Sequence, residues 1–296
     1  MLSILIPVYN YNVFPLVLEL QKQCLECNLK FEIICQDDAS NAFVVENQAI
    51  NNLENCYFSF NEINLGRGRN RNYLASKAKF PWLLFLDCDT FPRDSNFIKK
   101  YLFEIEKKNQ QAIFGGIIYN EDKPKKEQLL RWTYGHKRES LSVEKRKKNP
   151  NIRALTSNLL LKKELFLQFP FDESIKKYGY EDLCFLIALK KNQIIVSHLE
   201  NPTFHLNLET SKLFLDKTKM ALDNLLLLHN SNKITKEASK IIKMYSSQKE
   251  LKTISIIVYF FNTFENEITI NLLSKKPSLL LFDIYKLGYY CKIQSK

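Results

Sequence analysis

The sequence predicts an α/β fold with a mostly parallel sheet, covered by helices on both faces and followed by a helical extension. Short apolar runs alternate with segments of helical periodicity through about the first 200 residues. Strands and helices that alternate in this way form parallel sheets. Hydrophobic residues make up 45% and charged residues 25% of the 296 residues, which supplies a core and excludes disordered and fibrous classes.

Each expected element follows from its apolar pattern. The expected strands are Leu2–Val8, Phe31–Cys35, Cys56–Phe60, Trp82–Leu86, Ala112–Tyr119, Ala154–Leu161 and Ile194–His198. The expected helices are Phe14–Leu25, Ala42–Leu53, Arg69–Lys79 and Asn96–Lys107, and Phe166–Ile187 combines a turn, an acidic pair and an amphipathic helix. After about Thr210, helical patterns follow one another without strands. We therefore expect one domain over residues 1–210 and a helical extension over residues 211–296.

The net charge of +11 is unevenly distributed. Residues 1–120 carry 12 basic and 13 acidic side chains, and residues 151–210 carry seven of each. The excess lies in residues 121–150, with ten basic against five acidic, and in residues 211–296, with 14 against seven. A protein that coats nucleic acid would be basic over its binding face. We therefore expect no nucleic-acid partner.

The cysteines and the N-terminus indicate a reducing environment. Seven cysteines are an odd number, and the chain enters apolar sequence at Leu2 without a basic leader. Neither a signal peptide nor an apolar run of membrane-spanning length is present, so we expect free thiols and a cytoplasmic location. The pair Cys24 and Cys27 lacks a partner pair at zinc spacing, so we interpret it as structural.

Carboxylates follow two of the expected strands. Asp87 and Asp89 come after the strand Trp82–Leu86, and Asp37 and Asp38 come at the end of the second strand. Ligands collect at the carboxyl ends of parallel strands, and Mg²⁺ or Mn²⁺ prefers carboxylate oxygens. For Asp87-x-Asp89 a solvated turn or a helix cap is the plain alternative, and for Asp37-Asp38 it is a loop that caps the next helix.

Two further segments have the chemistry of a ligand site. Tyr9 follows the first strand and offers a flat face for a base, or serves as a core or rim tyrosine. The segment Asn64–Asn72 brings two glycines and three arginines to the start of a helix, where an anion can bind. It is neither a P-loop nor a dinucleotide fingerprint, and a capped loop with solvated arginines is the alternative.

Seven short motifs occur in a fixed order along the chain. They are Ser3–Asn10, Asp37–Ser40, Asn64-Leu65-Gly66 with Arg71-Asn72, Asp87-Cys88-Asp89, Ser157-Asn158, Phe171-Asp172-Glu173 and Tyr178–Asp182. Taken together, these motifs resemble family-2 glycosyltransferases with the GT-A fold, over about residues 2–206. The motifs Asp87-Cys88-Asp89 and Gly179–Asp182, the second followed by a histidine, particularly resemble bacterial capsule and chondroitin-type polymerase domains and the GalNAc-transferase group.

The resemblance implies a nucleotide-sugar donor, with UDP favoured, and a Mn²⁺ or Mg²⁺ cofactor. It implies that Tyr9 stacks on the base and Asp38 binds the base edge, while Asp89 and His205 ligate the metal. A structural histidine is the alternative for His205. The full nucleotide-binding set that it implies is Pro7, Tyr9, Asn10, Asp38, Gly66, Arg71 and Asp87, with Pro7 beside the base, Arg71 near the donor and Asp87 on the ribose or sugar.

The late acidic pair supplies the expected catalysis. By the resemblance, Asp182 is the general base that takes the proton of an acceptor hydroxyl, and Glu181 orients the acceptor or the sugar. One displacement inverts the anomeric centre. In the alternative, Asp182 only occupies the first turn of a helix. We expect transfer of a hexose or N-acetylhexosamine to a glycan or lipid-linked glycan in surface polysaccharide or lipo-oligosaccharide synthesis.

The two basic regions leave alternatives open. Residues 123–148 form a solvated face, or bind an anionic acceptor or the phosphates of a lipid carrier. Apolar stretches at 254–264 and 279–290 can lie at an anionic membrane surface, or they pack on the domain or form a homodimer. Other classes of function are a catalytically silent sugar-nucleotide-binding module, a nucleic-acid-binding protein and a nucleotidyltransferase.

Overall fold

The structure is a computed structural model that describes residues 1–107 and 110–295, and it divides into two compact units. The first comprises Met1–Tyr119, Ser140–Lys176 and Glu181–Asn207. The second comprises Asn120–Glu139, Lys177–Tyr180 and the chain from Leu208 onward. The expected division at residue 210 stays a prediction.

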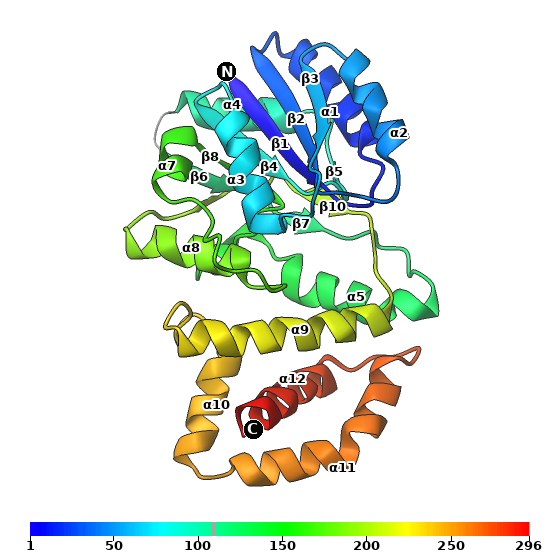
Figure 1. Ribbon diagram of the computed structural model, residues 1–296, viewed down its shortest axis with the longest axis vertical. Coiled ribbons are helices and arrows are strands. Elements are labelled where there is room, and N and C mark those ends of the chain that lie inside the picture. The colour runs from blue at the N-terminus through cyan, green and yellow to red at the C-terminus, as the bar shows by residue number, and fades with distance from the viewer. Residues whose placement is uncertain (108–109, 296) are drawn as a thin grey trace. The chain divides into compact units, whose positions relative to one another are not determined.

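A seven-stranded sheet organises the first unit (Figure 1). Its order is β3-β2-β1-β4-β8-β6-β9. The first four of these strands are mutually parallel, whereas β8 runs antiparallel to both β4 and β6. The strands are β1 Leu2–Val8, β2 Phe31–Asp37, β3 Cys56–Phe60, β4 Trp82–Leu86, β6 Ala112–Phe114, β8 Asn158–Lys162 and β9 Ser197–His198. The predicted α/β class with a mostly parallel sheet is confirmed.

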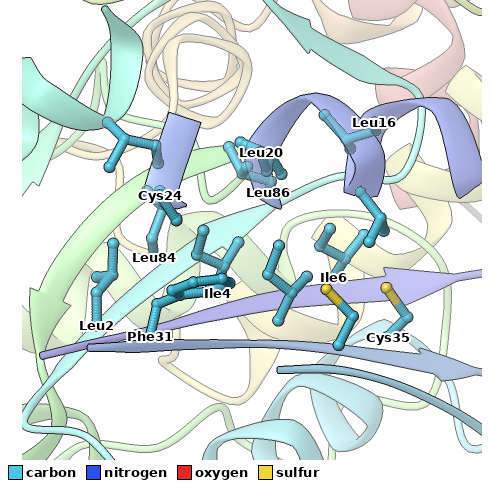
Figure 2. Packing of buried hydrophobic residues seen from close by; sticks show 14 of the residues in the cluster. Leu2, Ile4, Ile6, Leu16, Leu20, Cys24, Phe31, Cys35, Leu84 and Leu86 are labelled. Carbon is cyan, nitrogen blue, oxygen red and sulfur yellow. The ribbon is translucent and has the colours of Figure 1, made fainter. Parts of the chain in front are cut away.

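Helices pack on both faces of this sheet. Alternate residues of a strand point to opposite faces, so Ile4 and Ile6 of β1 join the cluster that holds Leu16 and Leu20, as Figure 2 shows. Leu5 of the same strand joins a second cluster. The helices of this unit are α1 Phe14–Glu26, α2 Val44–Gln48, α3 Arg67–Lys77, α4 Phe97–Glu106, α6 Val143–Lys147, α7 Lys163–Gln168 and α8 Glu181–Lys191.

The expected strand Ala112–Tyr119 is wrong, because the chain changes sheets at Gly115 and Gly116. After β6 it enters β7 (Ile117–Ile118) in a three-stranded sheet of order β5-β10-β7, with β5 at Thr90–Pro92 and β10 at Thr203–His205. Gly116 has φ +106°, a region that favours glycine. A Cβ atom at Gly115 would lie 2.4 Å from the Asn201 carbonyl oxygen. The break therefore depends on both glycines.

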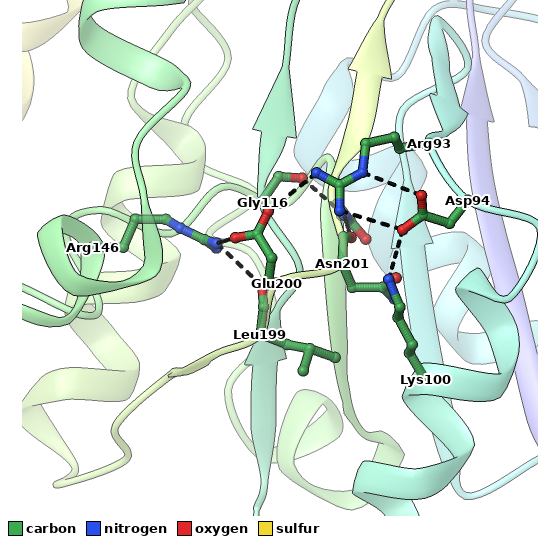
Figure 3. A network of polar contacts seen from close by, with 9 residues as sticks. Arg93, Asp94, Lys100, Gly116, Arg146, Leu199, Glu200 and Asn201 are labelled. Carbon is green, nitrogen blue, oxygen red and sulfur yellow. Dashed lines mark hydrogen bonds and ion pairs between the residues drawn. The ribbon is translucent and has the colours of Figure 1, made fainter.

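Arg146 belongs to the basic region at residues 123–148, but its side chain is buried (Figure 3). Its guanidinium donates to the carbonyl oxygens of Phe114 and Leu199 at 3.3 and 3.1 Å and lies 3.6 Å from the Glu200 carboxylate. Glu200 also pairs with Arg93 at 3.3 Å. The guanidinium thus satisfies backbone acceptors beside the sheet break, so this member of the run is structural and not part of a solvated face.

Helices make up most of the second unit. Thr210, Ser239 and Ser278 cap α9, α10 and α12, because each side chain accepts an N–H bond from the first turn. Phe261 of α11 packs with Phe282 and Tyr285 of α12. The helices are α5 Leu129–Tyr134, α9 Ser211–Asn230, α10 Lys240–Glu250, α11 Ile254–Leu272 and α12 Leu279–Gln294. Within the described ranges, no helix has the length and apolar character to cross a bilayer.

We expect Gly115→Ala to lower the free energy of unfolding by about 2 kcal/mol, because the new methyl group collides with a carbonyl oxygen and with the Tyr101 hydroxyl. Urea denaturation followed by circular dichroism measures the change. Gly68→Ala is the matched control, since the nearest atom to its Cβ is 3.4 Å away and alanine favours the helix. Equal stability of Gly115→Ala and the wild type would contradict this account.

Candidate active site

Loops that follow β1, β2 and β4 lie at one edge of the sheet, because these strands are parallel. Asn10, at φ +48°, donates its N–H to the Ser40 hydroxyl at 2.7 Å, and its side chain accepts from the Asn41 N–H at 2.9 Å. The first two loops are therefore tied together. Tyr9, which precedes Asn10, is 52% exposed, so it is not a core tyrosine. Pro7 lies within β1, opposite Gln36.

Asp38 fastens the loop that precedes α3. Its two carboxylate oxygens accept the N–H groups of Leu65 and Gly66 at 2.8 and 2.9 Å, and one also accepts from the Asn61 amide at 2.9 Å. Gly66 has φ +84° at the helix N-cap, which only glycine adopts readily. The structure therefore gives Asp38 and Gly66 a role in shaping the loop. Base binding by Asp38 stays a prediction.

Asp37 is the neighbour that the sequence reasoning left without a role. One carboxylate oxygen accepts the Ser40 N–H at 2.8 Å. The other oxygen is buried and has no hydrogen-bond partner in the described part of the chain. Asp37 lines a pocket of about 380 Å³ together with Ser40, Asn41 and Asn61. A buried acceptor without a partner is costly, so a donor group that reached this oxygen would stabilise it.

Arg71 of α3 joins the carboxylates of two distant segments. Its Nη2 donates to Asp87 at 2.7 Å and its Nη1 lies 3.4 Å from an oxygen of Asp182. The Arg71 side chain is 2% exposed, and the two carboxylates are 31% and 27% exposed. Burial lowers the pKa of Arg71, but the two aspartates more than compensate and raise it. The cation is permanent and fixes both carboxylates.

Glu181 and Asp182 occupy the first turn of α8, where the helix dipole favours negative charge. One oxygen of Glu181 lies 3.7 Å from the Arg67 guanidinium. The other is buried and unpartnered among the described residues. Burial and the nearby Asp182 raise the pKa of Glu181. The pair therefore consists of one carboxylate held by Arg71 and one that lies beside Arg67 with its second oxygen buried.

Asp89 and His205 meet across the small sheet. β10 pairs with β5 so that His205 lies opposite Thr90, and His205 Nε2 is 3.6 Å from Asp89 Oδ2. The Tyr119 ring stacks on the imidazole with centroids 5.4 Å apart. Burial and then Asp87 raise the pKa of Asp89, against the effect of His205. The sheet break after β6 supplies β7, which pairs with β10 on its other side, and Tyr119, which stacks on His205.

The Asp89 and His205 pair fits a divalent cation in part. A carboxylate oxygen and an imidazole nitrogen are suitable ligands at neighbouring positions. No cluster of three or more His, Cys, Asp or Glu ligands is found in residues 1–107 and 110–295. Mg²⁺ typically takes one or two carboxylates and completes its shell with water and substrate phosphates. Two protein ligands are therefore chemically sufficient, and the metal stays a prediction.

Asn158 is the second residue whose role the sequence did not reveal, although it belongs to a quoted motif. Its amide donates to the carbonyl oxygens of Gly116 and Asn201, both at 2.9 Å, and accepts from the Tyr101 hydroxyl at 2.6 Å. Asn158 therefore stabilises the sheet break after β6 and the segment at Asn201. The sequence feature that could have indicated this role is that Asn158 is a polar residue at the start of the apolar strand β8.

Comparisons with known proteins point to one family. The model of the family described as "Glycosyl transferase family 2" matches residues 3–167. A Haemophilus influenzae protein described as an uncharacterized glycosyltransferase is 40% identical over 96 residues, which are 30% of this chain and 29% of the relative. The chain thus spans less than a third of that relative.

Solved structures share the fold. The crystal structure of S. aureus TarS 1-349 has a TM-score of 0.53 at 17% identity, over 100% of this chain and 92% of that chain. The same TarS 1-349 in complex with UDP-GlcNAc has a TM-score of 0.52 at 17% identity, over 99% and 90%. A longer TarS chain has a TM-score of 0.52 at 18% identity, over 76% of this chain and 39% of that chain. At these identities the likeness establishes the fold.

We expect Arg71→Met to lower the free energy of unfolding by about 3 kcal/mol, because it leaves two close carboxylates without their buried cation. Arg69→Met is the matched control on the same helix, since Arg69 is 43% exposed and 3.7 Å from Glu173. It should cost less than about 0.5 kcal/mol. Urea denaturation of both variants measures the difference, and equal losses would contradict the role assigned to Arg71.

Proposed function

The chain belongs to glycosyl transferase family 2, and we propose that it transfers a sugar from a nucleotide-sugar to a glycan or lipid-linked glycan acceptor. The observation that carries the proposal is the meeting of Asp87 and Asp182 on Arg71, with Asp89 beside His205, in the first unit. Such a cluster can hold a charged donor on one side and activate a hydroxyl on the other.

We propose a UDP-sugar as the donor. The chain shares its fold with a TarS structure solved with UDP-GlcNAc, and this likeness supports the choice of donor. Tyr9 would stack on the base, and Pro7, Asn10, Asp38 and Gly66 would form the surrounding loops. The exposed ring of Tyr9 and the pocket lined by Asp37, Ser40 and Asn41 support a base site. The sugar would be a hexose or an N-acetylhexosamine.

The proposed reaction is a direct displacement with inversion. The acceptor oxygen forms a bond to the anomeric carbon, the bond from that carbon to the diphosphate breaks, and the acceptor proton passes to Asp182. A general base must reach its proton within hydrogen-bond distance. The bond to Arg71 fixes one oxygen of Asp182, which leaves the second for the proton. Glu181, which lies beside Asp182 in the first turn of α8, would orient the acceptor or the sugar.

A Mn²⁺ or Mg²⁺ ion would be held by Asp89 and His205. Such an ion neutralises charge on a leaving diphosphate. Arg71 and Asp87 would position the donor beside it. The acceptor would place the reaction in surface polysaccharide or lipo-oligosaccharide synthesis at the cytoplasmic side of a membrane.

A donor panel tests the proposal directly. The chain is incubated with Mn²⁺ and with UDP-, GDP- and dTDP-sugars, and nucleotide release and donor binding are measured. Release or binding with a UDP-sugar supports the proposal. Absence of both with every donor would overturn it.

We expect Asp182→Asn to lower kcat by roughly 10²- to 10⁴-fold, because an amide cannot accept the acceptor proton. Binding of the donor, measured by calorimetry, should change little. Glu164→Gln is the control, since that carboxylate is 80% exposed. A kcat of Asp182→Asn close to that of the wild type would exclude Asp182 as the base.

We expect Asp89→Asn and His205→Gln each to weaken Mn²⁺ binding at least about tenfold, measured by calorimetry on the donor-saturated chain. His229→Gln is the control, because His229 binds the Ile234 carbonyl oxygen in the second unit. Unchanged Mn²⁺ affinity in both site variants would contradict the metal assignment.

A further inference from the structure

Helix α11 is apolar on two opposite faces. On one face Phe261, Ile268 and Leu272 are buried in the core of the second unit, together with Phe282 and Tyr285 of α12. Figure 1 shows α11 as a long orange helix at the border of this unit. A surface helix normally has a polar face opposite its buried one. The packing of the second unit therefore accounts for only one of the two apolar faces.

The opposite face, which we call the α11 outer face, exposes large apolar side chains. It consists of Ile256, Tyr259, Phe260, Phe264 and Ile270, whose exposed fractions are 67%, 75%, 48%, 42% and 62%. Ile256, Phe260 and Phe264 are four residues apart, and at 100° per residue Tyr259 and Ile270 fall on the same side of the helix. The Phe260 and Phe264 rings contact each other at 4.6 Å between centroids. Contiguous exposed apolar patches mark interaction sites.

Polar residues on the α11 outer face are few. By helical position Thr263, Asn266 and Glu267 share this side, and all three are exposed. Glu267 supplies its one negative charge. The face therefore remains predominantly apolar and aromatic along its length, which is about 28 Å for 19 residues at the rise of an α-helix.

Lysines flank both ends of this face. Lys249 and Lys252 precede α11, and Lys275 and Lys276 follow it. All four are exposed, and none forms an ion pair with another residue in the described ranges. Glu250 is the acidic residue between the first two. Four cations against one acid at the ends give the face a positive border.

We propose that the α11 outer face docks on a membrane surface that contains anionic lipid headgroups. The aromatic and aliphatic side chains would enter the boundary between headgroups and acyl chains, and the four lysines would bind lipid phosphates. Interfacial helices combine an apolar face with basic residues in this way. The helix lies along the surface and does not cross it.

Charge favours a membrane over a second copy of the chain. If two α11 outer faces paired, the lysines of one copy would lie against the lysines of the other in either orientation. Like charges at such a contact are unfavourable. A surface of anionic lipid headgroups instead complements the positive charge of the lysines at both ends of α11.

A vesicle flotation assay on the full chain tests the proposal. The probes are phosphatidylcholine vesicles with and without phosphatidylglycerol. We expect binding to the anionic vesicles that weakens at high salt. Lys275→Gln combined with Lys276→Gln should weaken partitioning by roughly 30-fold, at about 1 kcal/mol per lysine. Tyr259→Asn combined with Phe260→Asn should weaken it at least about tenfold.

Phe103→Asn is the matched control, because Phe103 is 60% exposed on α4 of the first unit. It should bind vesicles as the wild type does. Sedimentation equilibrium of the same proteins detects self-association. Two results would overturn the proposal: no binding of the wild type to anionic vesicles, or a stable homo-oligomer that Tyr259→Asn with Phe260→Asn dissociates. Circular dichroism verifies that each variant is folded.

Discussion

The buried cation of Arg71 is the interaction on which the arrangement of the site depends. It joins α3 to the loop after β4 and to the start of α8, which lies 111 residues away in the chain. Without it, Asp87 and Asp182 would face each other as two carboxylates in a partly desolvated site, which is unfavourable. The position of the proposed base therefore depends on a residue that need not take part in the proton transfer.

The arrangement of the site also depends on the break after β6, where the chain leaves the seven-stranded sheet. Gly115 and Gly116 let the chain leave β6 and enter the small sheet, and Asn158 satisfies the carbonyl oxygen of Gly116. Arg146 satisfies carbonyl oxygens at the ends of β6 and β9. This polar support permits a sharp change of direction inside a core, where unpaired backbone groups are costly. The break lets β7 pair with β10, the strand that carries the histidine beside Asp89.

The loops at the strand ends were predictable in position but less so in role. Parallel strands bring their carboxyl ends to one edge, so the grouping of Tyr9, Asp38 and Asp87 follows from the alternating pattern. The alternating pattern does not show which carboxylate oxygen lacks a hydrogen-bond partner. Asp38 binds the N–H groups of the Leu65–Gly66 loop, while its neighbour Asp37 keeps a buried oxygen without a partner in the described chain. The hydrogen bonds of Asp38 depend on the path of the Leu65–Gly66 loop, which lies 27 and 28 residues later in the chain.

The sequence by itself determined the α/β class, the strands that carry the carboxylates and the resemblance to family 2, because periodicity and motif order are local properties of the chain. It also located the basic excess outside the acidic cluster. Only the tertiary structure decided that Ala112–Tyr119 divides between two sheets, that Arg146 is buried and that α11 keeps an exposed apolar face. These outcomes depend on contacts between segments far apart in the chain, and residue spacing carries no record of such contacts.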